Sequence, residues 1–235
     1  MTDVHANLPA LEAALTAIRA IGCDSIIHTG DAIGIGPFPR ETLERLLAED
    51  NLRLVMGNHD WWYVNGLPDM RPEWMSEGEA AHHQWVHNAL GPDLRSVVAS
   101  WPWVIEEHFG HLRVAFAHYG LREDGSGFVD IVRQPTGDTL DKVFERVSAD
   151  LVFYGHHHPA ADHTGRARYV NPGSLGCFRE PVARFSVLDV ERDGSYTISQ
   201  QAASYDWTEL FRQLDEREVP LRALIRTDFF GRDPD

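Results

Sequence analysis

Apolar residues recur along the first sixty positions at two spacings, one helical and one extended. Between Asn7 and Gly22, apolar residues stand three or four positions apart, as on the buried face of a helix: Leu8, Leu11, Leu15 and Ile18. Asn7 can cap the start of this helix and Gly22 can end it. Residues 25–29 and 52–56 are short apolar runs, which predict buried strands. Between them, a loop rich in glycine and proline, residues 30–39, leads to a helix near residues 43–47.

The same alternation continues to the end of the chain. Helical spacing is found at residues 76–89, near 140–147 and from about residue 206 onward, and Pro92 can start a short helix. Extended patterns occupy residues 103–107, 113–118, 151–154, 168–170, 184–190 and 196–200. Hairpin turns are expected at Gly110 and at residues 192–195. The pattern predicts one α/β domain, residues 1–235, with an antiparallel part, two sheets and helices outside.

Composition narrows the function classes. Of 235 residues, 43% are hydrophobic and 24% are charged, as in globular rather than disordered proteins. The net charge is −15 and no basic run occurs, which disfavours binding to nucleic acid through its phosphates. No apolar run approaches the ~18 residues of a membrane span, and the first residues form no secretion signal. The two cysteines, Cys23 and Cys177, form no disulfide framework, so we expect a cytoplasmic protein without a membrane partner.

Histidine is the unusual component, with thirteen residues, and imidazole is the most common metal ligand. Five short polar motifs contain the candidates: Asp3-Val4-His5, Gly30-Asp31, Gly57-Asn58-His59-Asp60, His118 and Gly155-His156-His157-His158. The last four of these motifs follow the carboxyl ends of predicted strands. Because ligands gather at that edge of open α/β sheets, we expect the polar side chains of these motifs to converge there.

Seven side chains in these motifs are candidate metal ligands: Asp3, His5, Asp31, Asn58, His118, His156 and His158. In an extended segment, residues i and i+2 point to the same side, so Asp3 and His5 can share a cation, as can His156 and His158. Carboxylate, imidazole and amide oxygen together suit Mn, Fe, Co, Ni or Zn. Seven ligands are too many for one tetrahedral zinc and favour two cations.

In this order, the motifs resemble those of the calcineurin-like metallophosphoesterases, in particular their small bacterial and archaeal phosphodiesterase-like branch. Residues 3–13 resemble the first motif and helix of that branch, residues 30–37 its second motif, and residues 171–174 the loop after its last histidine motif. The resemblance extends over almost the whole chain. It implies a four-layer α/β/β/α sandwich, with two mixed sheets flanked by helices and metals at the strand ends between the sheets.

The resemblance also implies a role for each motif. It implies two divalent cations. Manganese is the metal we expect, and iron, zinc, nickel or cobalt are the alternatives. One cation is held by Asp3, His5 and His158, the other by Asn58, His118 and His156, and Asp31 bridges both. A hydroxide between the cations is the nucleophile, and His59 protonates the leaving alkoxide. Asp60 either orients His59 or caps the local turn. The implied substrate is a small phosphate ester, a diester rather than a monoester.

Two other functions use the same core. Protein phosphatases and dinucleoside-polyphosphate hydrolases share it, but the eukaryotic-type phosphatases carry Gly-Asn-His-Glu where this chain has Gly-Asn-His-Asp. A non-catalytic scaffold of the retromer complex also shares it, although the intact ligands and His59 argue against that role here. The family pattern places an apolar strand before the first Asp-x-His, whereas only Met1 and Thr2 precede Asp3. We expect that strand to be missing, shortened or outside the present sequence. The natural substrate and the oligomeric state are left open.

Several other residues suggest structural roles. His28 stands inside an apolar run and is expected to be a hydrogen-bonded histidine of the core. His82, His83 and His87 share one predicted helix and are expected to form a solvated face. Cys177 lies near a loop of the site, but nothing in the sequence identifies it as a nucleophile.

Overall fold

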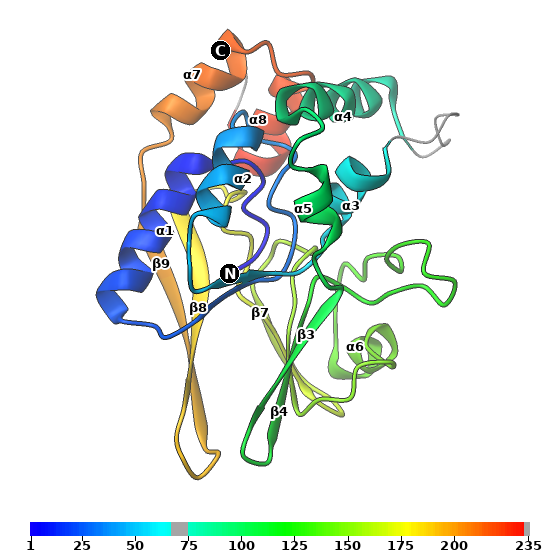
Figure 1. The fold of residues 1–235 in the computed structure, drawn as a ribbon, viewed down its shortest axis with the longest axis vertical. Coiled ribbons are helices and arrows are strands. Elements are labelled where there is room, and N and C mark those ends of the chain that lie inside the picture. Colours follow the sequence, from blue (N-terminus) through cyan, green and yellow to red (C-terminus); the bar gives the residue numbers. More distant parts are fainter. Residues whose placement is uncertain (67–74, 233–235) are drawn as a thin grey trace.

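The computed structural model describes residues 1–66 and 75–232, in which helices and strands alternate (Figure 1). The helices are α1 (Leu8–Ile21), α2 (Pro39–Leu47), α3 (Asn58–Asn65), α4 (Glu77–Leu90), α5 (Arg95–Ala99), α6 (Gly137–Val143), α7 (Thr208–Glu216) and α8 (Arg222–Phe230). The strands are β1 (Ile26–His28), β2 (Leu52–Leu54), β3 (Val104–Phe109), β4 (Leu112–Ala117), β5 (Leu151–Phe153), β6 (Ala161–Thr164), β7 (Arg168–Asn171), β8 (Val182–Val190) and β9 (Tyr196–Ser204). Over the described ranges, no helix is both long enough and apolar enough to cross a membrane.

The order of the elements confirms most of the expectations from the sequence. Helix α1 starts where the Asn7 side chain accepts a hydrogen bond from the Ala10 N–H (3.1 Å), and it ends at Gly22, which has a φ of 84°. The expected hairpin at Gly110 is formed by β3 and β4. Two elements were not expected: β6, and α3, which begins inside the Gly57–Asp60 motif.

A five-stranded sheet with the order β3-β4-β5-β7-β6 is the largest sheet. Its inner strands β4, β5 and β7 run parallel, whereas each edge strand runs antiparallel to its neighbour. One face of this sheet packs against α6 through Leu140 and Phe144. On the other face, Phe153 and Val170 share a hydrophobic cluster with Leu188 of β8. Strand β5 is therefore covered on both faces, as expected for a short apolar strand in a parallel arrangement.

Helix α1 covers a second β layer that consists of two small sheets. The parallel pair β1–β2 and the antiparallel pair β8–β9 each contain two strands. Leu11 and Leu15 of α1 share one hydrophobic core with Ile26 of β1 and Phe185 of β8. The layers are therefore α1, the two small sheets, the five-stranded sheet and α6, which confirms the expected four-layer α/β/β/α sandwich (Figure 1). The structure differs from the expectation of two mixed sheets, because the described strands β1 and β8 do not pair with each other.

Residues 1–3 lie between β1 and the chain that follows β7. On one side, the N–H of Thr29 donates to the carbonyl oxygen of Met1 (2.9 Å). On the other side, the N–H of Leu175 donates to the carbonyl oxygen of Thr2 (3.0 Å). The backbone that precedes Asp3 is thus hydrogen-bonded on both sides, as in the middle of a sheet.

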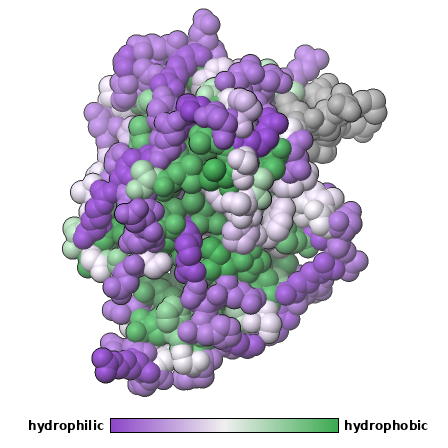
Figure 2. Space-filling view, in the orientation of Figure 1, coloured by the Kyte–Doolittle hydropathy of each residue, from purple (hydrophilic) through white to green (hydrophobic). Residues whose placement is uncertain are grey.

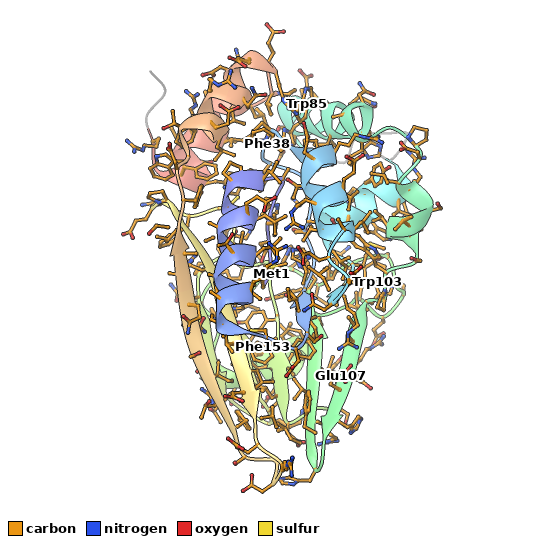
Figure 3. All side chains as sticks on the ribbon, turned by 60° about the vertical axis from the view of Figure 1, so that its left-hand side comes forward. Met1, Phe38, Trp85, Trp103, Glu107 and Phe153 are labelled. Atoms are coloured by element: carbon orange, nitrogen blue, oxygen red, sulfur yellow. The ribbon has the colours of Figure 1, made fainter. Side chains whose placement is uncertain are left out.

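A cavity of about 400 Å³ lies beside Met1, with residues of both β1 and β8 in its walls. Its lining includes Ile26, Phe153 and Phe185, and Figure 3 labels Phe153 and Met1. Figure 2 shows the molecule from the same side as Figure 1, with hydrophobic side chains gathered in the middle of the view and hydrophilic ones around them. The amino group of Met1 donates to the carbonyl oxygen of Ile27 (2.9 Å), and burial lowers its pKa to about 5. A backbone continued upstream of Met1 would enter this cavity between the free edges of the two small sheets.

We predict that five apolar residues added before Met1 stabilise the fold by filling the cavity. A fully buried aliphatic side chain contributes about 1.5–3 kcal/mol, whereas ordering each added residue costs about 1–2 kcal/mol. The added peptide bond also removes a buried amino group. We expect a net gain of about 2 kcal/mol, or roughly 4–8 °C in the melting temperature measured by calorimetry.

An equally long glycine–serine extension is the control, because it also removes the amino group but supplies no apolar side chains. Equal melting temperatures for the two extended proteins would show that strand residues do not fill the cavity.

Candidate metal centre

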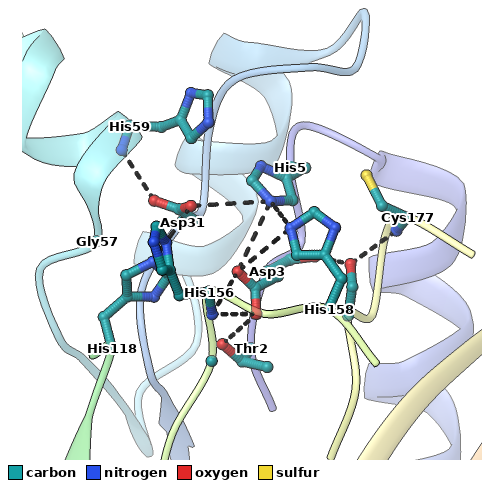
Figure 4. A network of polar contacts seen from close by, with 12 residues as sticks. Thr2, Asp3, His5, Asp31, Gly57, His59, His118, His156, His158 and Cys177 are labelled. Carbon is teal, nitrogen blue, oxygen red and sulfur yellow. Dashed lines mark hydrogen bonds and ion pairs between the residues drawn. The ribbon is translucent and has the colours of Figure 1, made fainter. Parts of the chain in front are cut away.

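The seven candidate ligands come from distant segments and meet at one point of the fold; all of them except Asn58 are labelled in Figure 4. Asp31, Asn58, His118 and His156 follow the carboxyl ends of β1, β2, β4 and β5, and residues 1–5 run between them and the loop after β7. Four of the seven side chains are almost completely buried: Asp3, His5, Asp31 and His118. The convergence expected from the sequence is therefore present, and it occurs because parallel strands end at the same edge of their sheets.

The first group of donor atoms contains Asp3, His5 and His158. The Nε2 atoms of His5 and His158 are 2.9 Å apart, and Asp3 Oδ1 is 3.7 Å from each of them. His5 Nδ1 faces the carbonyl oxygen of Ile33 (3.3 Å) and can donate its proton there, which leaves the Nε2 lone pair free. The hydroxyl of Thr2 donates to Asp3 Oδ2 (2.8 Å) and fixes the carboxylate. Three lone pairs thus point toward one small volume.

The second group contains Asn58, His118 and His156. Asn58 Oδ1 is 3.0 Å from His118 Nε2 and 2.9 Å from His156 Nδ1. His118 Nδ1 lies 2.8 Å from the carbonyl oxygen of Thr29 and donates to it, so that its Nε2 faces the group. Backbone carbonyls therefore set the tautomer of a histidine in both groups, an arrangement typical of metal-binding imidazoles.

Asp31 lies between the two groups. Its Oδ2 atom is 3.3 Å from His118 Nε2 and 3.8 Å from His5 Nε2, and its Oδ1 accepts the N–H of His59 (2.9 Å). Burial opposes ionisation of this carboxyl, but the nearby His118 and His59 hold its pKa well below the usual value. The same partner, Asp31, raises the pKa of His118 to about 9 against the effect of burial.

The donor atoms fit divalent cations. Asp31, His118 and His156 each offer a donor atom within 4.8 Å of the others, and so do His5, Asp31 and His59. Carboxylate oxygens and neutral imidazoles are ligands that borderline divalent cations accept. Burial lowers the pKa of His5 well below its usual value and that of His156 to about 3, so both rings are neutral and able to ligate at neutral pH.

The backbone of this site is not extended. Five of the seven residues have a left-handed φ, between 48° and 68°: Asp3, His5, Asp31, His156 and His158. The expectation that Asp3 and His5, or His156 and His158, share one side of an extended segment is therefore wrong. Asp3 and His5 both belong to the first donor group, whereas His158 belongs to the first and His156 to the second. Asp and His tolerate this conformation better than most residues, and such strained backbone is concentrated at functional sites.

The Gly57–Asp60 motif forms the start of α3. It places the His59 ring beside the first donor group and the Asp60 carboxylate against backbone N–H groups. The His59 ring lies beside His5 and Trp62, with ring centroids 5.1 Å and 5.0 Å away. Asp60 accepts backbone N–H groups with both carboxylate oxygens, from Asp31 (2.8 Å), Ala32 (3.1 Å) and Gly57 (3.0 Å). Its contacts therefore cap the local turn and fix the Asp31 loop, rather than orient the His59 ring.

Two histidines of α4 correct the expectation of a solvated face. His82 and His83 are buried, with exposed fractions of 5% and 7%. His82 Nε2 accepts the N–H of Ile35 (2.9 Å), and its Nδ1 lies 3.2 Å from the carbonyl oxygen of Pro220, to which it donates. His82 thus connects the loop that carries Asp31 to the segment before α8. The sequence could not reveal this, because the two residues that bond the His82 ring, Ile35 and Pro220, are 47 and 138 positions away.

His28 and Cys177 also differ from the expectations. His28 is fully buried as expected, but its ring nitrogens have no hydrogen-bond partner among the described residues, so it is not the hydrogen-bonded core residue we predicted. Cys177 Sγ lies within 4.8 Å of a ring nitrogen of His5 and of His158. Sequence reasoning did not include Cys177 in the site, and its only signal was its position just after residues 171–174.

We predict that Asp60→Asn destabilises the metal-free protein by about 3 kcal/mol. In either orientation the amide NH₂ would face a backbone N–H, and each buried donor left without an acceptor costs about 1–3 kcal/mol. Burial and the nearby Asp31 raise the pKa of Asp60 to about 7, so the loss comes from the unpaired donors and not from the removal of a charge. Urea denaturation measures the loss.

Asp93→Asn is the matched control, because it removes a carboxylate from an exposed ion pair with Arg40 and should have a much smaller effect. Equal losses in the two variants would contradict the capping role of Asp60.

Comparison with known proteins agrees with this geometry. Residues 1–193 match the calcineurin-like phosphoesterase superfamily domain. An uncharacterised protein of Methanocaldococcus jannaschii is 28% identical over 238 residues, which cover 94% of this chain and 92% of that protein. A hypothetical protein of Pyrococcus horikoshii has a similar structure, with a TM-score of 0.79 and 19% identity over 100% of this chain and 98% of its own.

A metallophosphoesterase of Sphaerobacter thermophilus also has a similar structure, with a TM-score of 0.67 and 24% identity over 94% of this chain and 93% of its own. At these identities the two structures establish the fold, and the domain match covers residues 1–193 of the 235. The chain therefore belongs to the calcineurin-like phosphoesterase superfamily.

Proposed function

We propose that the protein is a phosphodiesterase that works with two divalent cations. The position of Asp31 carries the proposal: one of its oxygen atoms is 3.3 Å from an imidazole nitrogen of the second group and 3.8 Å from one of the first. A carboxylate in that position can be shared by two cations. The preference for diesters comes from the branch of the family that the motifs resemble.

Each cation has its own set of protein ligands in this proposal. Asp3, His5 and His158 would hold one cation, and Asn58, His118 and His156 the other, with Asp31 shared. When bound, two divalent cations supply positive charge for the phosphate and lower the pKa of a water that attacks phosphorus. The ligand turns hold the two positions in a fixed relation, because they are hydrogen-bonded to one another through their backbones: the N–H of His5 donates to the carbonyl oxygen of Asp31, and the N–H of Gly155 to that of His118.

The charge of the site explains how a protein with a net charge of −15 could bind an anion. The proposed ligands contain two carboxylates, Asp3 and Asp31, and the others are neutral when they ligate. Two divalent cations therefore leave the loaded site positive, and bound ions dominate the local field. The acidic residues elsewhere are screened by solvent and act over longer distances.

His59 is assigned as the proton donor to the leaving oxygen. Its backbone N–H is fixed by Asp31, and its ring stands at the edge of the first group, beside His5 (Figure 4). Its Nδ1 atom is buried and has no partner among the described residues, close to Gly34. As the P–O bond breaks, the proton passes from the His59 imidazole to the departing alkoxide oxygen.

We predict that protein stripped of metal by a chelator does not hydrolyse bis-p-nitrophenyl phosphate and that added Mn²⁺ restores hydrolysis. Without the cations, nothing neutralises the substrate phosphate beside the two buried carboxylates. The release of p-nitrophenolate measures the rate, and p-nitrophenyl phosphate tests the preference for diesters.

Asp31→Asn, assayed at the same Mn²⁺ concentration, is the matched variant that removes only the shared carboxylate. Undiminished hydrolysis by the stripped protein would exclude metal-dependent catalysis.

We predict that His59→Ala slows hydrolysis of a dinucleoside monophosphate by about 10²–10⁴-fold in kcat. The effect on bis-p-nitrophenyl phosphate should be much smaller, because p-nitrophenolate leaves without a proton. The ratio of the two effects is the measurement that identifies a proton donor, since a structural defect would slow both substrates equally.

His111→Ala serves as the control, because His111 is an exposed histidine at the turn between β3 and β4. Equal losses on the two substrates in His59→Ala would reject the assignment.

A further inference from the structure

A thiol stands next to the first group of donor atoms. Cys177 is buried, with 4% of its surface exposed, and its Sγ lies within 4.8 Å of ring nitrogens of His5 and His158. Figure 4 shows its side chain next to those of the two histidines. The proposed hydrolysis does not use this sulfur.

The loop that carries Cys177 is attached to the first group of donors. The hydroxyl of Ser174 donates to the carbonyl oxygen of Asp3 (2.8 Å) and accepts the N–H of Cys177 (2.9 Å). The N–H of Gly176 donates to the same carbonyl oxygen (3.0 Å). A Cβ atom at position 176 would lie 1.8 Å from the carbonyl oxygen of Val4, so only glycine permits this approach. The position of Cys177 relative to Asp3 is therefore fixed by three hydrogen bonds and a close backbone contact.

We propose that Cys177 is an additional ligand of the cation held by Asp3, His5 and His158, so that the two cation sites differ in chemistry. This inference rests on the proposed two-cation function. The first site then offers sulfur, nitrogen and oxygen and takes a thiophilic cation such as Zn²⁺, Fe²⁺ or Co²⁺. The second site offers nitrogen and oxygen from Asn58, His118 and His156 and accepts harder cations such as Mn²⁺.

The distances allow this ligation with a small movement. Cys177 would be a fifth protein ligand beside Asp3, Asp31, His5 and His158, so bond angles of about 90° apply. With metal–sulfur and metal–nitrogen bonds of about 2.3 and 2.0–2.1 Å, sulfur and nitrogen are then about 3.1 Å apart. The sulfur of Cys177, now within 4.8 Å of the histidine nitrogens, would need to approach them by at most about 1.7 Å, which a rotation about its Cα–Cβ bond can supply. On ligation a sulfur–metal bond replaces the S–H bond, the proton leaves to solvent, and no electron is transferred.

The competing explanation is that Cys177 only packs. Its side chain belongs to a hydrophobic cluster with Ile35, Phe38 and Leu210, and a buried thiol often serves as a small apolar residue. Packing against this cluster would explain why the Cys177 side chain is buried. It would not explain why the sulfur lies beside the imidazoles of His5 and His158, whose Nε2 atoms face each other. The two explanations differ in what they predict for the spectrum of a bound cation.

The test is a titration of metal-free protein with Co²⁺, followed by absorption spectroscopy. Ligation by Cys177 gives a thiolate-to-cobalt charge-transfer band in the near ultraviolet, which reaches its maximum at one equivalent of cobalt. The band is absent from Cys177→Ala and Cys177→Ser and is retained in Cys23→Ser. Because the chain has two cysteines, a band in Cys23→Ser can come only from Cys177, even if the other variants fold poorly.

A competition experiment measures the selectivity. The protein is equilibrated with one equivalent of Zn²⁺ and an excess of Mn²⁺, and the bound metals are quantified by mass spectrometry after gel filtration. Because zinc is limiting and binds most tightly where sulfur is a ligand, we expect one zinc and one manganese per chain. Cys177→Ala should lower the zinc affinity of the first site by at least about tenfold, since even indirect partners of metal ligands contribute 10–100-fold, and should leave manganese binding unchanged.

The outcomes separate this inference from the proposed function. Two bound cobalt ions without a charge-transfer band would reject Cys177 as a ligand and leave the two-cation site intact. A band that persists in Cys177→Ala would also reject it. If no cobalt binds, both the inference and the two-cation site are wrong.

Discussion

The rest of this structure depends on the burial of two carboxylates, Asp3 and Asp31, where the ends of four strands meet. A buried carboxylate is costly unless hydrogen-bond donors or positive charges surround it. The backbone N–H of His156 faces Asp3 and that of His59 faces Asp31 (2.9 Å), while imidazoles approach both. To point amides and side chains inward together, the chain turns sharply after each strand, which explains the left-handed residues at the ligand positions.

These turns are maintained by residues that are not ligands. Asp60 ties the Asp31 loop to the start of α3, and His82 ties the same loop to α4 and the segment before α8. Ser174 ties the loop after β7 to the backbone of Asp3. Left-handed backbone at non-glycine residues is unfavourable by itself, so the surrounding structure has to determine it. The geometry of the centre is thus a property of the whole sandwich, and a ligand motif moved to another fold would not reproduce it.

Much of the fold and the convergence of the motifs could be predicted from the sequence, whereas several local details could not. Hydrophobic spacing located α1, the β3–β4 hairpin and the buried strand β5, because these elements bury one side or both sides of a regular segment. The motifs lie after strands, and strand ends converge in any such sheet. Left-handed turns leave no comparable pattern in the sequence, since they depend on contacts with other loops. The burial of His82 and the approach of Cys177 to the first group arise from segments that meet only in the folded chain.

The position of the two donor groups at the strand ends has a thermodynamic consequence. The cavity lies beside Met1 and Thr29, which are hydrogen-bonded to each other and adjoin the first ligands. A ligand that binds only the folded state stabilises it by mass action, by about 1.4 kcal/mol for each tenfold excess over its dissociation constant. Cations bound at these turns would therefore stabilise the loops that join the two β layers. Under the proposed function, the folded fraction of the protein would rise with the free cation concentration, so that metal supply would affect the amount of folded protein as well as its chemistry.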